Sequence, residues 1–224
     1  MILKDLYIQK LKSIKAELSQ DSELLIVSKT RSLEEIKTYY ELGHRDFGEN
    51  RVQELSEKAL ALKETCPDIR WHMIGHLQSN KVNALFKISN LYAVHSVHDL
   101  SLVQKLIQAE KHLQNSVHVF LQVNTSKEVE KSGFETYAEV KEAAELIRGS
   151  EKLNLAGLMT MGTLRTDNFE GEARRCFHEL HEMKDRLQAE FHAELKTSMG
   201  MSQDYKIALQ EKSNWIRLGT MMFS

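Results

Sequence analysis

A lysine ends the first strongly apolar segment of the chain and is a candidate amine nucleophile. The run LLIV at 24–27 predicts a buried strand, and Lys29 follows its carboxyl end. Burial penalises the charged form of a lysine, so a lysine at the mouth of a core suggests a chemical role. The alternative is structural, with the aliphatic stem lying on apolar surface while the ammonium reaches water. This stretch alone leaves both interpretations open.

Two stretches near the end of the sequence carry small residues suited to binding an anion. TSMGMSQDY places Ser198, Gly200 and Ser202 at a predicted strand-to-helix junction, and WIRLGT places Gly219 and Thr220 at another. Small side chains leave backbone N–H groups free to point at a phosphate, and a helix N-terminus favours negative charge. The alternative is that Ser202 simply caps the following helix.

Arg217 adds a cation to this group of residues. Strand alternation puts it on the same face as Trp215 and Gly219, and a guanidinium on an inner face needs an acceptor. An amine, a phosphate cradle and a cation together are what pyridoxal phosphate (PLP) requires. They also suit an aldolase that forms a Schiff base with a sugar phosphate, and the spacing does not separate the two.

The elements that position these residues alternate between two kinds of segment. Eight short apolar segments predict strands: LLIVSK, DFGEN, WHMIG, LYAVHSV, VHVFLQVN, LNLAGLMT, LKTSMG and WIRLG. Between them lie longer charged segments whose apolar residues recur every three or four positions, as in helices. With the amphipathic N-terminal segment MILKDLYIQKLKSIKAEL, this predicts an α/β fold: a single (β/α)8 TIM barrel with an additional N-terminal helix, in one domain over residues 1–224. Active sites of such barrels lie at the carboxyl ends of the strands, where Lys29 falls.

Composition narrows the function classes. A formal net charge of −2 gives no basic field, so we expect no nucleic-acid partner. The N-terminal segment lacks an uninterrupted apolar core, which argues against a signal peptide or a membrane span. Cys66 and Cys176 are too few for a disulfide framework, so we expect reduced thiols and a cytoplasmic location. We also expect a monomer. His178 and His181 lack the spacing of a zinc motif, and we expect no metal. We assign His95 to packing or solvent contact.

Several motifs, in order, closely resemble those of the pyridoxal phosphate homeostasis protein family. They are VSKT, RDFGENRVQE, WHMIGHLQSNK, VNTSKEVEKSGF, GLMTMG, SMGMSQD and IRLGT, and they span nearly the whole chain. The resemblance implies a barrel similar to the N-terminal domain of alanine racemase, with PLP held as a Schiff base on Lys29. It also implies that Arg217 faces the pyridine nitrogen. Ser198, Ser202, Gly219 and Thr220 are then expected to hold the phosphate, while Asn50, His72 and Met199 line the ring and its approaches.

The resemblance favours a PLP carrier that works in intracellular PLP homeostasis without catalytic turnover, with PLP-dependent apo-enzymes as candidate partners. The first alternative is a small PLP-dependent amino-acid racemase of the alanine racemase type. Alanine racemases carry a second domain that supplies a tyrosine base, and the sequence stops at Ser224, directly after the eighth predicted strand. We therefore expect a racemase's second base to be missing. The second alternative is a barrel that serves chiefly as a protein-binding module, for which the sequence shows no positive sign.

Overall fold

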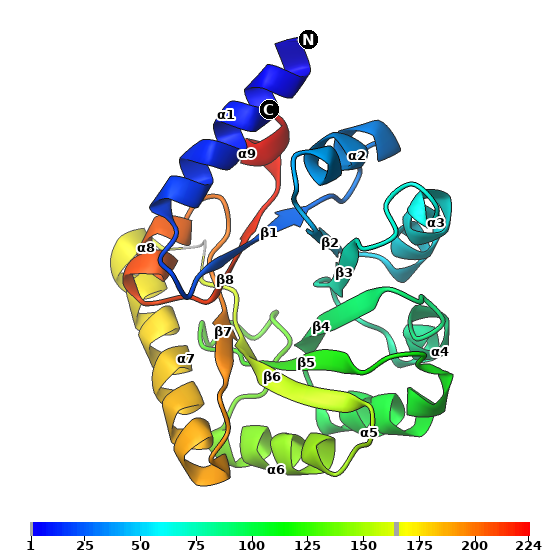
Figure 1. The fold of residues 1–224 in the computed structure, drawn as a ribbon. Helices are drawn as coiled ribbons and strands as arrows, with labels where there is room; N and C mark the ends of the chain where they lie inside the picture. Colours follow the sequence, from blue (N-terminus) through cyan, green and yellow to red (C-terminus); the bar gives the residue numbers. More distant parts are fainter. Residues whose placement is uncertain (1, 164–165) are drawn as a thin grey trace.

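Eight parallel strands close into a barrel in the computed structural model, which describes residues 2–163 and 166–224 (Figure 1). The strands follow one another around the barrel in chain order, and all eight predicted segments are confirmed. They are β1 (Glu23–Val27), β2 (Asp46–Glu49), β3 (Arg70–Met73), β4 (Leu91–Val97), β5 (Val117–Gln122), β6 (Leu153–Met159), β7 (Lys196–Ser198) and β8 (Trp215–Leu218).

Helices surround the strands, as the alternating pattern predicts. They are α1 (Ile2–Glu17), α2 (Leu33–Glu41), α3 (Val52–Leu62), α4 (Val82–Leu85), α5 (Leu100–Ala109), α6 (Tyr137–Arg148), α7 (Phe169–Phe191), α8 (Tyr205–Gln210) and α9 (Thr220–Phe223), with short 3₁₀ turns at Ser79–Lys81 and Glu110–His112. Helix α1 is the expected additional N-terminal helix. In the described part of the chain, none of the helices combines the length and the apolarity that crossing a membrane requires.

The barrel closes where its first and last strands pair. Leu25 of β1 stands beside Arg217 of β8, and Ile26 beside Leu218. Outside this seam, the ring of Tyr7 in α1 stacks on Tyr39 in α2 at 4.7 Å between centroids, and both rings meet Phe223 in α9 edge-on. Aromatic contacts thus cover the seam from outside.

Two hydrophobic clusters follow from strand alternation. The smaller cluster fills the barrel interior and draws its buried members only from strands: Leu25, Ala93, Phe120, Met159 and Trp215. The larger cluster lies between barrel and helices and includes the alternate strand residues, such as Leu24, Ile26 and Phe47. Because side chains alternate between faces, each strand residue can be assigned to the interior or to the helix layer from its neighbours.

Candidate functional site

Lys29 lies just beyond the end of β1, at the mouth of the barrel. Its side chain follows Leu25 in the inward-facing series of alternate residues. Lys29 is exposed and, among the described residues, has no hydrogen-bond or ion-pair partner. The structure therefore presents a free amine at the rim where barrel active sites lie.

Arg217 is a buried cation on the neighbouring strand. Its Nη1 donates to Ser198 Oγ at 2.8 Å and its Nη2 donates to the carbonyl oxygen of Thr160 at 2.9 Å. Within residues 2–163 and 166–224 no carboxylate forms an ion pair with it. Burial lowers the pKa of Arg217 to about 10, while the charge of Asp204 opposes this shift. The guanidinium is still protonated at neutral pH, so the mouth of the barrel holds a positive charge that only neutral oxygens contact.

The loops after β7 and β8 meet the loop after β1. The backbone of Gly200 has φ +94, and its carbonyl oxygen accepts a hydrogen bond from the N–H of Arg217 at 2.9 Å. A methyl group at Gly200 would stand 2.5 Å from Ala208 Cβ, so the tight turn admits only glycine. On the other side, a Cβ at Gly219 would lie 3.4 Å from that of Val27. These contacts bring the two predicted anion-binding stretches together beside the end of β1, which Lys29 follows.

Ser202 and Thr220 have free hydroxyl groups in these loops. Neither side chain hydrogen-bonds to any residue that the structure describes. The alternative role for Ser202, capping the next helix, is wrong, because α8 begins at Tyr205 and its N-cap residue is Asp204. Asp204 Oδ1 instead accepts the N–H of Met201 at 2.6 Å. The two hydroxyls remain available to a ligand.

A chain of hydrogen bonds crosses the barrel interior below the mouth. Asp46 Oδ1 lies 3.0 Å from His72 Nε2, and His72 Nδ1 lies 3.0 Å from His95 Nε2. His95 Nδ1 in turn lies 2.8 Å from the hydroxyl oxygen of Ser198, which Arg217 also contacts. All five side chains are buried. The chain therefore connects the rim cation to a carboxylate at the start of β2.

The protonation states of Asp46 and His95 indicate which atoms of this hydrogen-bond series carry a hydrogen. Hydrogen bonds from His72 and Arg70 lower the pKa of Asp46 although burial raises it, so its carboxylate accepts. Burial lowers the pKa of His95 well below its usual value, so that ring is neutral. When His72 is neutral and donates to Asp46 through Nε2, its Nδ1 accepts from His95 Nε2, and His95 Nδ1 is then the acceptor for Ser198. The single hydroxyl hydrogen of Ser198 then points at His95, while its oxygen accepts from Arg217.

The remaining predicted residues occupy different surroundings. His72 is fully buried in the interior, in contact with the ring of Trp215 at 5.2 Å between centroids, and reaches the mouth only through His95. Met199 alternates with the inward-facing Ser198, so its side chain packs in the cluster between barrel and helices rather than in the mouth. The series of hydrogen bonds that links Asp46 to Arg217 thus includes His95, a residue for which the sequence predicts only packing or solvent contact.

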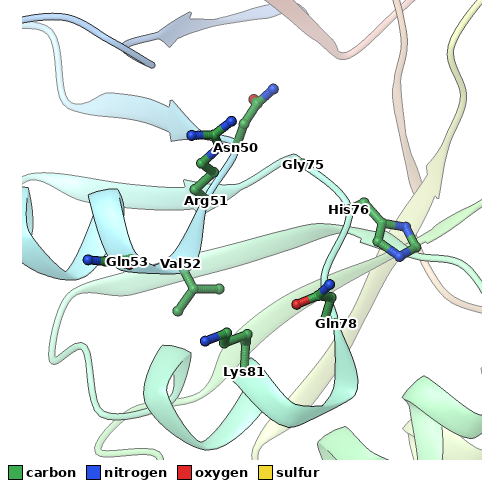
Figure 2. A pocket seen from close by; sticks show the side chains of 8 residues that line it. All are labelled: Asn50, Arg51, Val52, Gln53, Gly75, His76, Gln78 and Lys81. Carbon is green, nitrogen blue, oxygen red and sulfur yellow. The ribbon is translucent and has the colours of Figure 1, made fainter.

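Asn50 lies at the rim after β2, in a hollow of about 490 Å³ between that loop and the loop after β3 (Figure 2). A Cβ at Gly75 would stand 2.2 Å from the carbonyl oxygen of Asn50, so the two loops touch through backbone. Arg51 and Lys81 also line the hollow, whereas the other predicted cofactor residues do not. Among the described residues, no group of three histidine, cysteine or acidic side chains is placed to hold a metal ion.

Comparison with known proteins gives three kinds of match. The family model described as alanine racemase, N-terminal domain, matches residues 5–224. The pyridoxal phosphate homeostasis protein of Schizosaccharomyces pombe is 34% identical over 200 residues, which are 89% of this chain and 82% of that protein. The corresponding protein of Aquifex aeolicus is 37% identical and covers 90% of this chain and 86% of its own length. The chain belongs to the pyridoxal phosphate homeostasis protein family.

Solved structures agree with this family assignment. PipY of Synechococcus elongatus without PLP superposes with a TM-score of 0.88 at 31% identity, covering 96% of this chain and 99% of that one. The same protein with PLP bound gives a TM-score of 0.86 at 30% identity, with coverages of 97% and 100%. Alanine racemase of Clostridium difficile gives a TM-score of 0.78 at 16% identity and 56% of its chain, which shows that the family shares its barrel.

Proposed function

We propose that this chain binds PLP with Lys29 as the covalent amine and acts in PLP homeostasis as a carrier. The observation that carries the proposal is the pairing of a free amine with a buried cation at one rim. Arg217 has only neutral acceptors among the described residues, and Lys29 has none. A buried charge that no ion pair contacts directly is costly, and an acceptor atom of a bound ligand offsets part of that cost.

The residues around the mouth fit the parts of PLP. Ser202 and Thr220 offer hydroxyl donors for the phosphate, because neither hydroxyl has a partner among the described residues. Ser198 is engaged with Arg217 and His95, so we assign it the support of Arg217 in place of the phosphate contact that the family resemblance implies. Asn50 stays a proposed neighbour of the ring, and Met199 packs behind the site, in the cluster between barrel and helices.

PLP supplies an aldehyde that bonds reversibly to amines and a ring that withdraws electrons when its nitrogen is protonated. In the proposed arrangement Arg217 faces that nitrogen. Because its pKa of about 10 keeps it a hydrogen-bond donor at neutral pH, it opposes protonation of the ring nitrogen. Holding the cofactor is thereby favoured over withdrawing electrons from an amino acid.

The racemase alternative has weaker support. The curated relatives are called homeostasis proteins, and the racemase structures are 15 to 17% identical, which supports a common barrel alone. An exposed Lys29 suits exchange of PLP with other proteins, so PLP-dependent apo-enzymes are the partners we propose. We further propose that the chain acts as a monomer in the cytoplasm, and the buried free thiols of Cys66 and Cys176 suit a reducing compartment.

Borohydride trapping tests the binding site. The protein is incubated with PLP, reduced, digested and mapped by mass spectrometry. We expect the pyridoxyl group on Lys29 and its loss in Lys29→Ala, with Lys4→Ala as the control for an exposed lysine. A pyridoxyl group confined to other lysines contradicts the assignment.

Isotope exchange tests the carrier role. The PLP-loaded protein is incubated with L-alanine in deuterated water, and α-hydrogen exchange and chirality are followed against free PLP. We expect exchange near the rate with free PLP, together with transfer of PLP to an apo-enzyme. Turnover far above that rate, abolished in Lys29→Ala, favours the racemase.

A further inference from the structure

A buried lysine lies beneath the loop that carries Lys29. Lys58 sits on α3 with 8% of its side chain exposed, and its ammonium has three hydrogen-bond acceptors. These are the carbonyl oxygen of Ser28, Glu49 Oε1 and Glu54 Oε1, each 2.7 Å from Nζ. An ammonium has three N–H donors, so every donor of Lys58 has a partner.

The groups that bind the Lys58 ammonium also hold Ser28 and Thr30, the two residues on either side of Lys29. Ser28 Oγ donates to Glu49 Oε1 at 2.7 Å, which fixes the Ser28 side chain on the helix side of the barrel. The N–H of Thr30 donates to Glu54 Oε1 at 2.6 Å, and Thr30 has φ +61. A left-handed conformation is unfavourable for a non-glycine residue, and a charge-assisted hydrogen bond offsets that cost.

Burying these charged side chains costs free energy, so stabilising the fold does not by itself explain them. Burial raises the pKa of Glu49, although Lys58 and Ser28 lower it, and Glu49 Oε2 is buried without a partner. Two acidic side chains, Glu49 and Glu54, compete for the single ammonium of Lys58. Well-packed apolar residues often stabilise a fold as well as a buried ion pair does. The polar groups instead give this loop one defined conformation.

We propose that Lys58, with Glu49 and Glu54, positions the amine of Lys29. Since Ser28 is held outward, the next residue must leave the strand on the opposite face, over the mouth of the barrel. Thr30, held at its positive φ, turns the chain away immediately afterwards. This inference rests on the proposed function, in which Lys29 is the covalent amine, and it adds three positioning residues that do not touch the cofactor.

Glu54 offers the sharpest test, because 25% of its side chain is exposed and Glu49 still holds Lys58 when Glu54 is changed. Glu54→Ala removes the acceptor for the Thr30 N–H. Glu54→Gln keeps an acceptor oxygen at the same place and serves as the rescue. Glu57→Ala, an exposed residue three positions further along the same helix, is the matched control.

Two measurements separate positioning from general stability. In the free protein, we expect trypsin to cleave after Lys29 and Arg31 at least tenfold faster in Glu54→Ala than in wild type. With ligands, we expect the Kd for PLP to rise about tenfold. The Kd for 4′-deoxypyridoxine 5′-phosphate, which lacks the aldehyde, should change less than twofold. Glu54→Gln and Glu57→Ala should match wild type in both measurements.

Other outcomes overturn the proposal. Unchanged cleavage and unchanged PLP affinity in Glu54→Ala show that the Glu54 carboxylate does not position Lys29. Equal weakening of both ligands shows a structural role, and so does a Glu54→Gln variant as impaired as Glu54→Ala. Failure of the proposed function gives a different result, because borohydride reduction of the wild-type protein then places the pyridoxyl group on a residue other than Lys29. Trypsin cleavage of the ligand-free Glu54→Ala variant still shows whether Glu54 positions the loop that carries Lys29.

Discussion

Arg217 and His95 contact the same oxygen atom, the hydroxyl of Ser198, at 2.8 Å each. The guanidinium can only donate, so the Ser198 oxygen accepts from it, and with a neutral His72 the hydroxyl hydrogen points at His95 Nδ1. Ser198 therefore joins the rim cation to the interior histidines, and its hydroxyl has no hydrogen left for a phosphate.

The first prediction concerns Ser198→Ala. It leaves a guanidinium N–H and an imidazole nitrogen buried without partners, so we expect the free energy of unfolding to fall by about 2 to 4 kcal/mol. Urea denaturation measures this decrease. PLP and unphosphorylated pyridoxal should weaken together, since Arg217 is released in both cases. If PLP alone weakens, Ser198 contacts the phosphate directly, as the family resemblance implies.

The second prediction concerns the free hydroxyls of Ser202 and Thr220. In the double alanine variant we expect PLP binding to weaken by about 1.5 to 3 kcal/mol for each hydrogen bond to the phosphate that the substitution removes. Binding of pyridoxal should stay nearly unchanged, because it has no phosphate. Titration of the visible absorbance measures both affinities, with Ser13→Ala on α1 as an exposed control. Equal weakening of the two ligands argues for a phosphate site elsewhere.

The third prediction is a loss of stability in mild acid. Burial lowers the pKa of His44 to about 4 and that of His95 well below 6.5. Below pH 6.5 the unfolded chain binds protons that the folded protein does not, so the free energy of unfolding falls as pH falls. For His44 the decrease reaches about 3 kcal/mol near pH 4.

Urea denaturation between pH 7.5 and 4 checks this dependence. His44→Gln should flatten the profile, while the exposed control His178→Gln should leave its slope unchanged. A wild-type stability that stays constant down to pH 5 speaks against neutral buried histidines.

The fourth prediction concerns Gly75. An alanine methyl would stand 2.2 Å from the carbonyl oxygen of Asn50, so the loops after β2 and β3 must separate. We expect stability to fall by at least about 2 kcal/mol and Asn50 to be displaced. Gly149→Ala is the comparison, because the nearest atom to a methyl group there is a carbonyl oxygen at 3.4 Å. Thermal unfolding distinguishes the two variants, and similar melting temperatures refute the prediction.

The barrel was predictable because apolar residues recur with different spacings in its strands and in its helices. Short apolar segments with Lys29, Ser198 and Arg217 near their ends identified the strands, and parallel pairing brings those ends to one rim. Alternation also placed Arg217 and Trp215 on the same face, inside the barrel. These features depend on local pattern, which a single sequence records.

Contacts between distant side chains were not predictable in the same way. His95 meets Ser198 across 103 positions, and a histidine on a buried strand looks the same whether it packs or bonds. Lys58 reads as one charged residue of an exposed helix, yet it is buried under the β1 loop. In both cases the decisive fact is which atoms meet, and periodicity carries no information about that.

The seam between β1 and β8 gives the site a place in the order of folding. Lys29 follows the first strand, Arg217 lies in the last strand and Thr220 follows it, so the amine and its facing groups come together only after all eight strands have been made. During synthesis the first strand leaves the ribosome well before its partner, at roughly 5 to 20 residues per second. Pairing two segments so far apart in the sequence costs loop-closure entropy, whereas a helix forms from neighbouring residues and avoids that cost. The growing protein therefore becomes able to hold a ligand at this rim only after its eighth strand has joined the first.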